Sequence, residues 1–397
     1  MTYTIAEART ELRLASWART ACPSPLQEML TAASRPGIIS LALGMPDENL
    51  FPTREFADAT QLVLATNPHA LQYGPHSQSL KAQVVALMKR RGVTCNEEQI
   101  FLTAGAQQGM CLLARLLLEP GSDVIAEELI YTGFQQVLEP FQPRVLTVPT
   151  SLETGMDVDA VEAHLRRGAR PAFIYAITEG HNPLSVSLSK EKRIRLVELA
   201  RHYGVPIIED DAYGFLCYEG KLEPPLRALD EQFVFYVGSF SKIVAPGLRV
   251  GWLVVPEALI KPLSIVKEST DIDSTTFPQR VLNAYLETGQ LTDHIKHLCT
   301  QYRLRRDTML EALREHFPDE TRWTTPSSGM FVWLENDNID ALDLFNTALT
   351  TAKVAFIPGF AFGVGAVRLK PHAMRLNFSY CSPENIKEGI ARLGRLL

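Results

Sequence analysis

Residues 238–252 read GSFSKIVAPGLRVGW, and this stretch decides the fold. Its lysine, Lys242, comes soon after an apolar run, residues 233–237, that has the composition of a buried strand. Such a strand delivers the amine into the protein interior, where a lysine rarely lies without a partner. Burial lowers the pKa of an amine and makes it more nucleophilic. A lysine of this kind is suited to forming a Schiff base with an aldehyde cofactor.

The neighbours of Lys242 offer a place for a phosphate group. Ser239, Ser241 and Arg249 all carry hydrogen-bond donors that suit phosphate oxygens. A reactive lysine, phosphate donors and a flanking strand together indicate pyridoxal 5′-phosphate (PLP). The alternative interpretation is a surface turn with a solvated lysine.

The composition fits a large soluble chain, with 397 residues, 46% hydrophobic content and a net charge of −6 that forms no concentrated block. It points to neither nucleic acid nor a membrane as a partner, and residues 1–14 are unlike a signal peptide. The six scattered cysteines argue against metal ribbons and disulfide frameworks and favour a reducing cytoplasm. His294 and His297 lie one turn apart with Lys296 between them, which indicates a solvated helix face, so no metal site is expected.

Two more segments have the pattern of a buried strand followed by polar or small residues. The predicted strand at residues 204–209 leads directly into Asp210, and Tyr213 follows three positions later. Acidic residues at the C-terminal end of a buried strand face the ligand crevice in open α/β sheets. The strand at residues 100–103 leads through a small-residue turn into a helix near Ala106 and Gln107. Backbone N–H groups at such a helix start are expected to bind an anion.

Other candidate residues follow further apolar runs. Residues 172–177 are typical of a strand in a parallel sheet, and the segment after it contains Asn182. Tyr131 follows a predicted strand at residues 123–128. Arg375 begins an otherwise apolar strand near residues 374–378, where a charged group needs a partner. A guanidinium binds a carboxylate through two parallel hydrogen bonds, which fixes orientation as a lysine could not.

Together these segments resemble the fold-type I PLP-dependent aminotransferases of class I/II, in particular the branch that contains α-aminoadipate and kynurenine aminotransferases. The resemblance covers nearly the whole chain. It is carried by residues 44–46 (Gly-Met-Pro), 71–75 (Leu-Gln-Tyr-Gly-Pro), 105–108 (Gly-Ala-Gln-Gln), 182–183 (Asn-Pro), 210–213, 238–252, 326–333 and 374–378 (Met-Arg-Leu-Asn-Phe).

The resemblance implies a role for each candidate site residue. The implied catalytic residues are Lys242, which binds the cofactor and acts as a base, Asp210, which pairs with the pyridine nitrogen, and Tyr131, which stacks on the ring. Further cofactor contacts are implied for Ala106, Gln107, Asn182, Tyr213, Ser239, Ser241 and Arg249, and for Tyr73 across a dimer interface. Substrate contacts are implied for Gly44, Asn182 and Arg375, of which Arg375 clamps the α-carboxylate.

The chain departs from the family pattern near the predicted pocket. His181 stands where the family usually has glutamine, and Glu179 adds an acid two positions earlier. His181 is interpreted either as a second proton-transfer group or as a side chain that packs or points to solvent. The loop at residues 74–81 is shorter than usual. Gln27, in the segment at residues 24–28, replaces an arginine found in members that prefer acidic substrates, which weakens a dicarboxylic assignment.

The resemblance implies an α/β protein of the PLP-transferase fold type I. A large PLP-binding domain with a mostly parallel sheet is expected at residues 50–285. A smaller α+β domain combines residues 1–49 with residues 286–397, and a periodic segment at residues 281–316 is expected to be the helix that crosses between the two. The implied assembly is a homodimer with shared active sites.

The expected function is transfer of an amino group between an L-amino acid and a 2-keto acid, through a Schiff base on Lys242. Two alternatives stay open. One is a related PLP enzyme that acts at Cα, Cβ or Cγ by elimination, replacement, cyclisation or oxidation. The other is the effector domain of an aminotransferase-like transcription regulator, which would need a DNA-binding domain ahead of Gly44, where only about forty residues stand.

Overall fold

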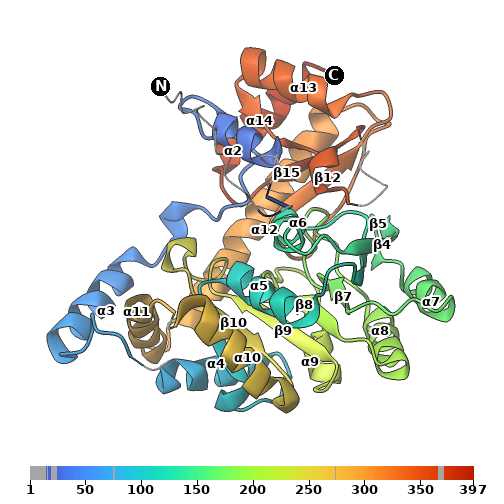
Figure 1. Ribbon diagram of the computed structural model, residues 1–397. Coiled ribbons are helices and arrows are strands. Elements are labelled where there is room, and N and C mark those ends of the chain that lie inside the picture. The colour runs from blue at the N-terminus through green and yellow to red at the C-terminus, as the bar shows by residue number, and fades with distance from the viewer. Residues whose placement is uncertain (1–14, 16, 19–24, 75–76, 273, 365–370) are drawn as a thin grey trace, which may run out of the picture.

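A computed structural model describes residues 15, 17–18, 25–74, 77–272, 274–364 and 371–397. Within them the largest element is a seven-stranded sheet that crosses the lower half of the molecule (Figure 1). Its strands, in spatial order, are β2 (Ile100–Thr103), β10 (Gly251–Val254), β9 (Val234–Ser239), β8 (Ile207–Asp210), β7 (Phe173–Ala176), β3 (Asp123–Glu127) and β4 (Arg144–Val148). Strands β4, β3, β7, β8 and β9 pair in parallel, and β10 runs antiparallel to both of its neighbours. The prediction of a mostly parallel sheet is confirmed.

One edge of this sheet collects the C-terminal ends of its parallel strands. Thr103 at the end of β2 and Ser239 at the end of β9 both pair with Gly251, where β10 begins. Asp210 at the end of β8 pairs with Val237 of β9. The residues that follow β2, β7, β8 and β9 therefore emerge side by side, which is where open α/β sheets bind ligands.

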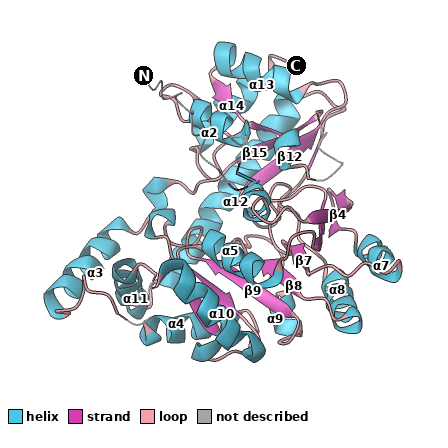
Figure 2. Cartoon of the chain, viewed as in Figure 1, coloured by secondary structure: helices cyan, strands magenta, loops and turns pink. Residues whose placement is uncertain are grey.

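Helices cover both faces of the sheet, as Figure 2 shows by colour. On one face, α5 (Ala106–Leu117), α6 (Thr132–Leu138) and α10 (Glu257–Asp271) pack against strand residues such as Ile208 and Val237. On the other face, α7 (Val158–Arg166), α8 (Lys190–Tyr203) and α9 (Leu226–Leu229) pack against residues such as Ile174 and Ile207. Because helices bury both faces of the sheet, the strand sequences are continuously apolar and do not alternate between apolar and polar residues.

A second, antiparallel sheet lies above the first in Figure 1 and is made of β11 (Arg322–Trp323), β12 (Phe331–Glu335), β15 (Ala373–Asn377) and β14 (Ile357–Pro358). The helices around it are α12 (Leu291–His316), α13 (Ala341–Thr347) and α14 (Pro383–Gly394). The N-terminal segment joins this part, because β1 (Ile39–Ser40) pairs with β13 (Val354–Ala355), and α2 (Pro25–Ala33) lies beside it. The domain boundaries at residues 49 and 285 stay a prediction.

The expected single helix at residues 281–316 is wrong. Two helices, α11 (Thr276–Glu287) and α12, are separated by a turn in which Gly289 has a φ of +76°. A residue with a side chain adopts this left-handed conformation only with strain, so glycine ends the first helix. α11 packs beside α3 (Thr53–Thr66), and α4 (Gln78–Arg90) lies nearby at the lower left of Figure 1. A small hairpin of β5 (Thr150–Ser151) and β6 (Gly155–Met156) completes the named strands.

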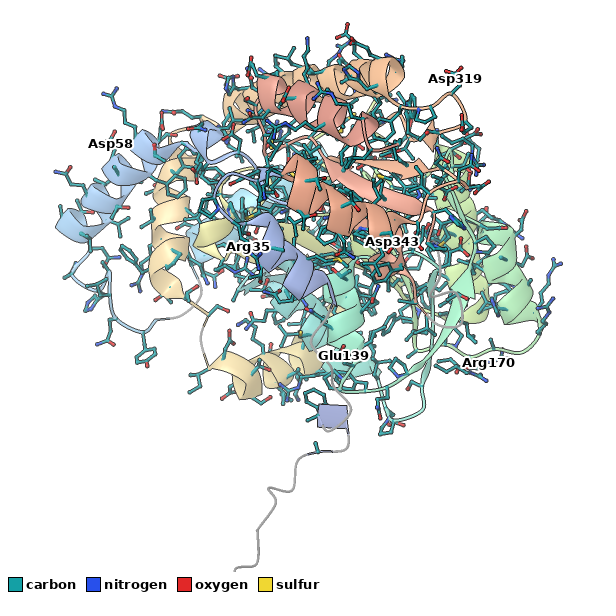
Figure 3. All side chains as sticks on the ribbon, turned by 90° about the horizontal axis from the view of Figure 1, so that it is seen from above. Arg35, Asp58, Glu139, Arg170, Asp319 and Asp343 are labelled. Carbon is teal, nitrogen blue, oxygen red and sulfur yellow. The ribbon has the colours of Figure 1, made fainter. Side chains whose placement is uncertain are left out.

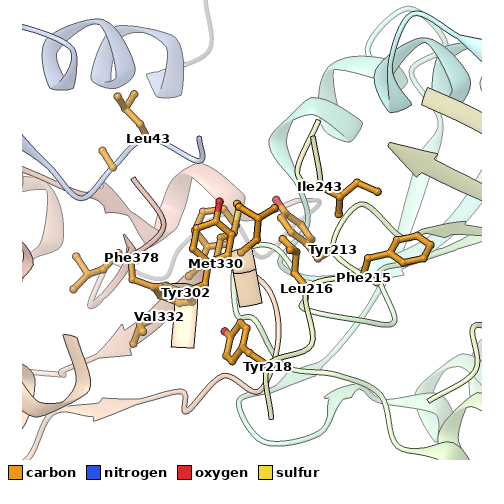
Figure 4. Packing of buried hydrophobic residues seen from close by; sticks show 14 of the residues in the cluster. Leu43, Tyr213, Phe215, Leu216, Tyr218, Ile243, Tyr302, Met330, Val332 and Phe378 are labelled. Carbon is orange, nitrogen blue, oxygen red and sulfur yellow. The ribbon is translucent and has the colours of Figure 1, made fainter. Parts of the chain in front are cut away.

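A continuous apolar cluster joins the two sheets. Figure 4 shows Tyr213 and Leu216, which follow β8, beside Met330, which immediately precedes β12; Val332 of β12 belongs to the same cluster. The charged residues that Figure 3 labels are all exposed: Arg35, Asp58, Glu139, Arg170, Asp319 and Asp343. No helix among the described residues is both long enough and apolar enough to cross a membrane.

Candidate functional site

A cavity of about 390 Å³ lies between the strand-end edge of the large sheet and the second sheet. Twelve of the thirteen predicted site residues line it: Gly44, Ala106, Gln107, Tyr131, Asn182, Asp210, Tyr213, Ser239, Ser241, Lys242, Arg249 and Arg375. The thirteenth, Tyr73, lies in the segment between α3 and α4 with 85% of its surface exposed. The structure therefore brings twelve of the predicted residues together around one cavity, and Tyr73 stands apart from it within this chain.

Lys242 lies in the turn after β9, where the strand delivers it to the cavity. Its Nζ donates a hydrogen bond to the Gly44 carbonyl at 2.7 Å. Burial lowers the pKa of this amine to about 8, with further lowering by the positive charges of Arg375 and Arg249. Roughly a tenth of the amine is therefore neutral and nucleophilic at pH 7, far more than for an ordinary lysine.

Asp210 is the last residue of β8, and only one of its two carboxylate oxygens has a hydrogen-bond partner. Oδ2 accepts a hydrogen bond from the Tyr175 hydroxyl at 2.8 Å, whereas Oδ1 is buried without a partner among the described residues. Burial raises the pKa of this carboxyl to about 6, although the Tyr175 hydrogen bond opposes the shift. A buried oxygen without a donor is unfavourable. A protonated pyridine nitrogen would supply that donor, so this residue fits PLP.

The start of α5 has the features of a phosphate site. The first-turn N–H groups of a helix have no acceptor within it, and Ala106 and Gln107 line the cavity at this point. Gly105 before them has a φ of +85°, and a Cβ there would lie 2.6 Å from Nη2 of Arg249. The Arg249 Nη2 itself donates to the Ala104 carbonyl at 3.1 Å. A cation beside open helix N–H groups is what a phosphate needs, and this region therefore also fits PLP.

The ring of Tyr131 closes one side of the cavity at the start of α6. A Cβ at Gly133 would lie 2.4 Å from this ring, so only glycine permits the position that the ring takes. The Gly133 carbonyl in turn accepts a hydrogen bond from Gln107 Nε2 at 2.7 Å. Burial raises the pKa of the Tyr131 hydroxyl, and the charge of Asp210 adds to the effect. A neutral aromatic ring held in this way can stack on a pyridine.

Arg375 lies in the middle of β15 and is buried, so the prediction that it begins the strand is wrong. Its guanidinium lies 4.1 Å from the ring centroid of Phe331 and 4.7 Å from that of Phe362. Nη1 donates to Asn182 Oδ1 at 2.9 Å and Nη2 to the Ala42 carbonyl at 2.9 Å. Burial lowers its pKa to about 10. The described residues give this cation no carboxylate partner, and a carboxylate of a ligand would fill that role.

The two unusual residues near Asn182 are both buried, and neither lines the cavity. Glu179 pairs with Arg193 of α8 at 2.8 Å and accepts a hydrogen bond from Ser328 Oγ at 2.7 Å. It thus ties the large sheet to the loop before β12. His181 accepts a long hydrogen bond from the Leu184 N–H at its Nδ1, and its Nε2 lies 3.1 Å from Glu127 Oε2 without good hydrogen-bond alignment.

The sequence did not single out the other residues that line the cavity. Besides Gln27, they are Leu30, Leu43, Met45, Met110, Thr132, Gly133, Gln136, Ile177, Ala212, Pro246 and Phe331. These residue types resemble ordinary core or helix positions, so periodicity alone could not assign them to a site. Gln27 also lines the cavity, in agreement with its position in the segment singled out for specificity. Ser24, Pro75 and His76 lie outside the described residues.

Comparisons with known proteins agree with this geometry. The family model for aminotransferase class I and II matches residues 36–393. An aromatic-amino-acid aminotransferase of Thermococcus litoralis is 36% identical over 94% of this chain and 91% of its own length. A 2-aminoadipate transaminase of Thermus thermophilus is 36% identical over 94% of both chains. The crystal structure of a Pyrococcus horikoshii kynurenine aminotransferase superposes with a TM-score of 0.91, 36% identity and 96% coverage of both chains. The chain therefore belongs to the class I and II aminotransferases of fold type I, enzymes that use pyridoxal 5′-phosphate as their cofactor.

Proposed function

We propose that the protein transfers an amino group from an L-amino acid to a 2-keto acid, with Lys242 as the residue that binds the cofactor and moves the proton. The observation that carries this proposal is the convergence of Lys242, Asp210 and Arg375 on one cavity. When bound, PLP supplies an aldehyde for the substrate amine and a ring that accepts electrons from the substrate Cα. Because a keto acid receives the amino group, the net reaction needs no other oxidant or reductant.

Lys242 is proposed as the general base and acid. Its depressed pKa, about 8, suits an amine that must both take and return a proton near neutral pH. The hydrogen bond to the Gly44 carbonyl places Nζ at the cavity. Once the substrate amine has replaced it on the cofactor, the Lys242 amine would be free to take the proton of the substrate Cα and return it on the cofactor side.

Asp210 is proposed to hold a proton on the ring nitrogen of the cofactor. Its free Oδ1 accepts that N–H, while Tyr175 fixes the carboxylate through Oδ2. An opposite charge at this place favours the protonated nitrogen, and the ion pair relieves the cost of burying the carboxylate alone.

Arg375 and Asn182 are proposed to orient the substrate through its α-carboxylate. The guanidinium is held between two aromatic rings, so its plane is fixed before the substrate binds. A guanidinium that is oriented before the substrate binds sets the direction of the substrate Cα–H bond. This lowers the entropic part of the activation barrier.

The substrate side chain is proposed to be uncharged. Among the residues that the structure describes, the cations that line the cavity are Lys242, Arg249 and Arg375, and each already has a proposed role toward the cofactor or the α-carboxylate. The remaining walls are apolar residues such as Leu30, Met45 and Met110, with the amides of Gln27 and Gln136 at the rim. A second carboxylate would be buried there without a cation.

A homodimer is proposed from the surface around Tyr73. Leu71, Tyr73 and Ile272 expose 77%, 85% and 85% of their surfaces. Thr276 Oγ1 donates to the Gln72 carbonyl at 3.3 Å, so the start of α11 lies beside Gln72. Large apolar side chains exposed in this way favour a protein interface, and Tyr73 would then reach the cofactor phosphate of the partner subunit.

The decisive experiment is a product analysis. Purified holoenzyme is incubated with a panel of L-amino acids and one 2-keto acid, and all products are identified by mass spectrometry. Transamination yields one new keto acid for each new amino acid, and neutral amino acids should react faster than dicarboxylic ones. Release of ammonia without a new amino acid, or loss of a side-chain group, would instead support the alternative reaction at Cβ or Cγ.

A further inference from the structure

We propose that a largely buried network of four side chains sets the shape of the phosphate-binding turn and thereby the affinity for the phosphate group of PLP. The network consists of Gln108, Lys267, Asp271 and Ser274, and we call it the Asp271 network. None of these residues lines the cavity, so they are positioning residues. The inference rests on the proposed placement of the phosphate at the start of α5.

The turn in question is residues 104–106, and side chains fix it on both sides. The Ala104 N–H donates to Gln108 Oε1 at 2.7 Å, and the Ala104 carbonyl accepts from Arg249. Thr103 Oγ1 donates to the Gly105 carbonyl at 3.0 Å. The N–H and carbonyl of Ala104 and the carbonyl of Gly105 thus all have hydrogen-bond partners. The N–H groups of the first helical turn stay open for an anion.

The direction of the Gln108 amide depends on Asp271, the last residue of α10. Gln108 Nε2 donates to Asp271 Oδ2 at 2.7 Å. An ionised carboxylate can only accept hydrogen bonds, so it must face the amide nitrogen, and this leaves the amide oxygen for the Ala104 N–H. An uncharged partner at position 271 would permit either direction of the amide.

Lys267 and Ser274 keep Asp271 ionised and in place. Lys267 Nζ donates to Asp271 Oδ1 at 2.7 Å and to Ser274 Oγ at 2.6 Å, and Ser274 Oγ donates to Oδ2 at 2.8 Å. Lys267 and Ser274 are each only 3% exposed. Burial alone would raise the pKa of Asp271, but the hydrogen bonds from Lys267, Gln108 and Ser274 outweigh it and lower that pKa. A buried cation and carboxylate are stable when every partner is present.

Two substitutions separate this role from general stability. Asp271→Asn keeps the shape of the side chain but removes the acceptor-only group that orients Gln108. Gln108→Met removes the link to the Ala104 N–H and leaves Lys267, Asp271 and Ser274 paired, so this variant should fold even if the first does not. Asp293→Asn is the matched control, because Asp293 forms an exposed ion pair with Lys296 on α12, on a different helix.

The measurement compares two ligands that differ only in the phosphate. Apoenzyme is titrated with PLP and with pyridoxal, and the dissociation constants are obtained from the absorbance change. Both variants should bind PLP ~10-fold more weakly, the effect of one lost charge-assisted hydrogen bond, and should bind pyridoxal as the wild type does. Asp293→Asn should change neither constant.

Three other outcomes would overturn the inference. Unchanged PLP affinity in both variants would mean that the turn keeps its shape without the network. Equal weakening of PLP and pyridoxal would indicate general damage, which thermal unfolding of the apoenzyme would also report. If wild-type apoenzyme binds PLP and pyridoxal equally well, the phosphate is not held at this turn. The proposed function is tested separately, by the turnover of amino acids.

Discussion

The carboxyl of Asp210 is expected to change its contribution to stability with pH. Its pKa is raised to about 6 from an ordinary value of 3.8 because it is buried. A folded-state pKa above the unfolded one means that the folded state binds the proton more tightly, so stability is lost as pH rises from about 4 to about 6. In apoenzyme this group should lower the free energy of unfolding by about 3 kcal/mol at pH 7 relative to pH 3.5. Asp210→Asn should lack this part of the pH dependence, as urea unfolding at several pH values would reveal.

The same variant should separate binding from catalysis. Asp210→Asn keeps the phosphate contacts and Lys242, so PLP should still bind. An amide cannot support protonation of the ring nitrogen, and turnover should fall by ~10²-fold or more. Steady-state kinetics and a PLP titration of the same preparation check this, and full turnover by the variant would contradict the role of Asp210.

Lys242 should be the residue that carries the cofactor. Borohydride reduction of the holoenzyme followed by peptide mass mapping should place a pyridoxyl group on Lys242, because its amine lines the cavity and has a lowered pKa. Lys267 is an internal control, since it is also buried but is paired with Asp271. A pyridoxyl group on any other lysine would refute the assignment.

His181→Gln should leave turnover nearly unchanged. The imidazole lies behind the cavity wall, next to Glu127 and the Leu184 N–H, and glutamine can make similar contacts. Turnover and the spectrum of the bound cofactor, measured from pH 6 to pH 9, test this. A loss of ~10²-fold would instead assign His181 a proton-transfer step and would favour chemistry beyond plain transamination.

At the scale of single elements, β15 and the strands beside it decide how the substrate is held. Arg375→Lys should mainly raise the KM for the amino acid, because an ammonium cannot form the two-pronged contact or stack between Phe331 and Phe362. PLP affinity should not change. Arg322→Lys, on the exposed end of β11, is the control. A fall in kcat at constant KM would show that Arg375 acts in the transition state only.

The elements also show what the sequence could and could not predict. Lys242, Asp210 and the 104–107 turn each follow a strand of apolar residues, and the rule that ligands bind at strand ends brings them together without any coordinates. Tyr175 was not predictable, because an aromatic residue in a buried strand looks like core until the facing carboxyl is known. The turn at Gly289 was missed because helical periodicity continues through it, and the φ that ends the helix is not visible in a hydrophobic pattern.

At the scale of the whole molecule, the proposed dimer makes a prediction that links assembly to cofactor binding. Ile272→Lys places a charge on an exposed apolar residue four positions before Thr276, which contacts Gln72, so it should shift the protein toward monomer and weaken PLP binding. Multi-angle light scattering and PLP titration measure the two effects. Ile265→Lys, on the exposed side of α10, is the control. A monomeric wild type that binds PLP normally would contradict the shared-site arrangement.

The pairing of β1 with β13 has a consequence for biosynthesis. Ser40 pairs with Ala355, so roughly 300 positions must leave the ribosome before the strand that leads to Gly44 finds its partner. At ordinary translation rates the nascent chain waits for roughly 15 to 60 seconds with this segment unpaired. The large sheet can form during that interval. The Gly44 carbonyl, which accepts the hydrogen bond of the Lys242 amine, takes up its folded position only near the end of translation. The ability to hold the cofactor and substrate is therefore acquired late, near or after the end of synthesis of each chain.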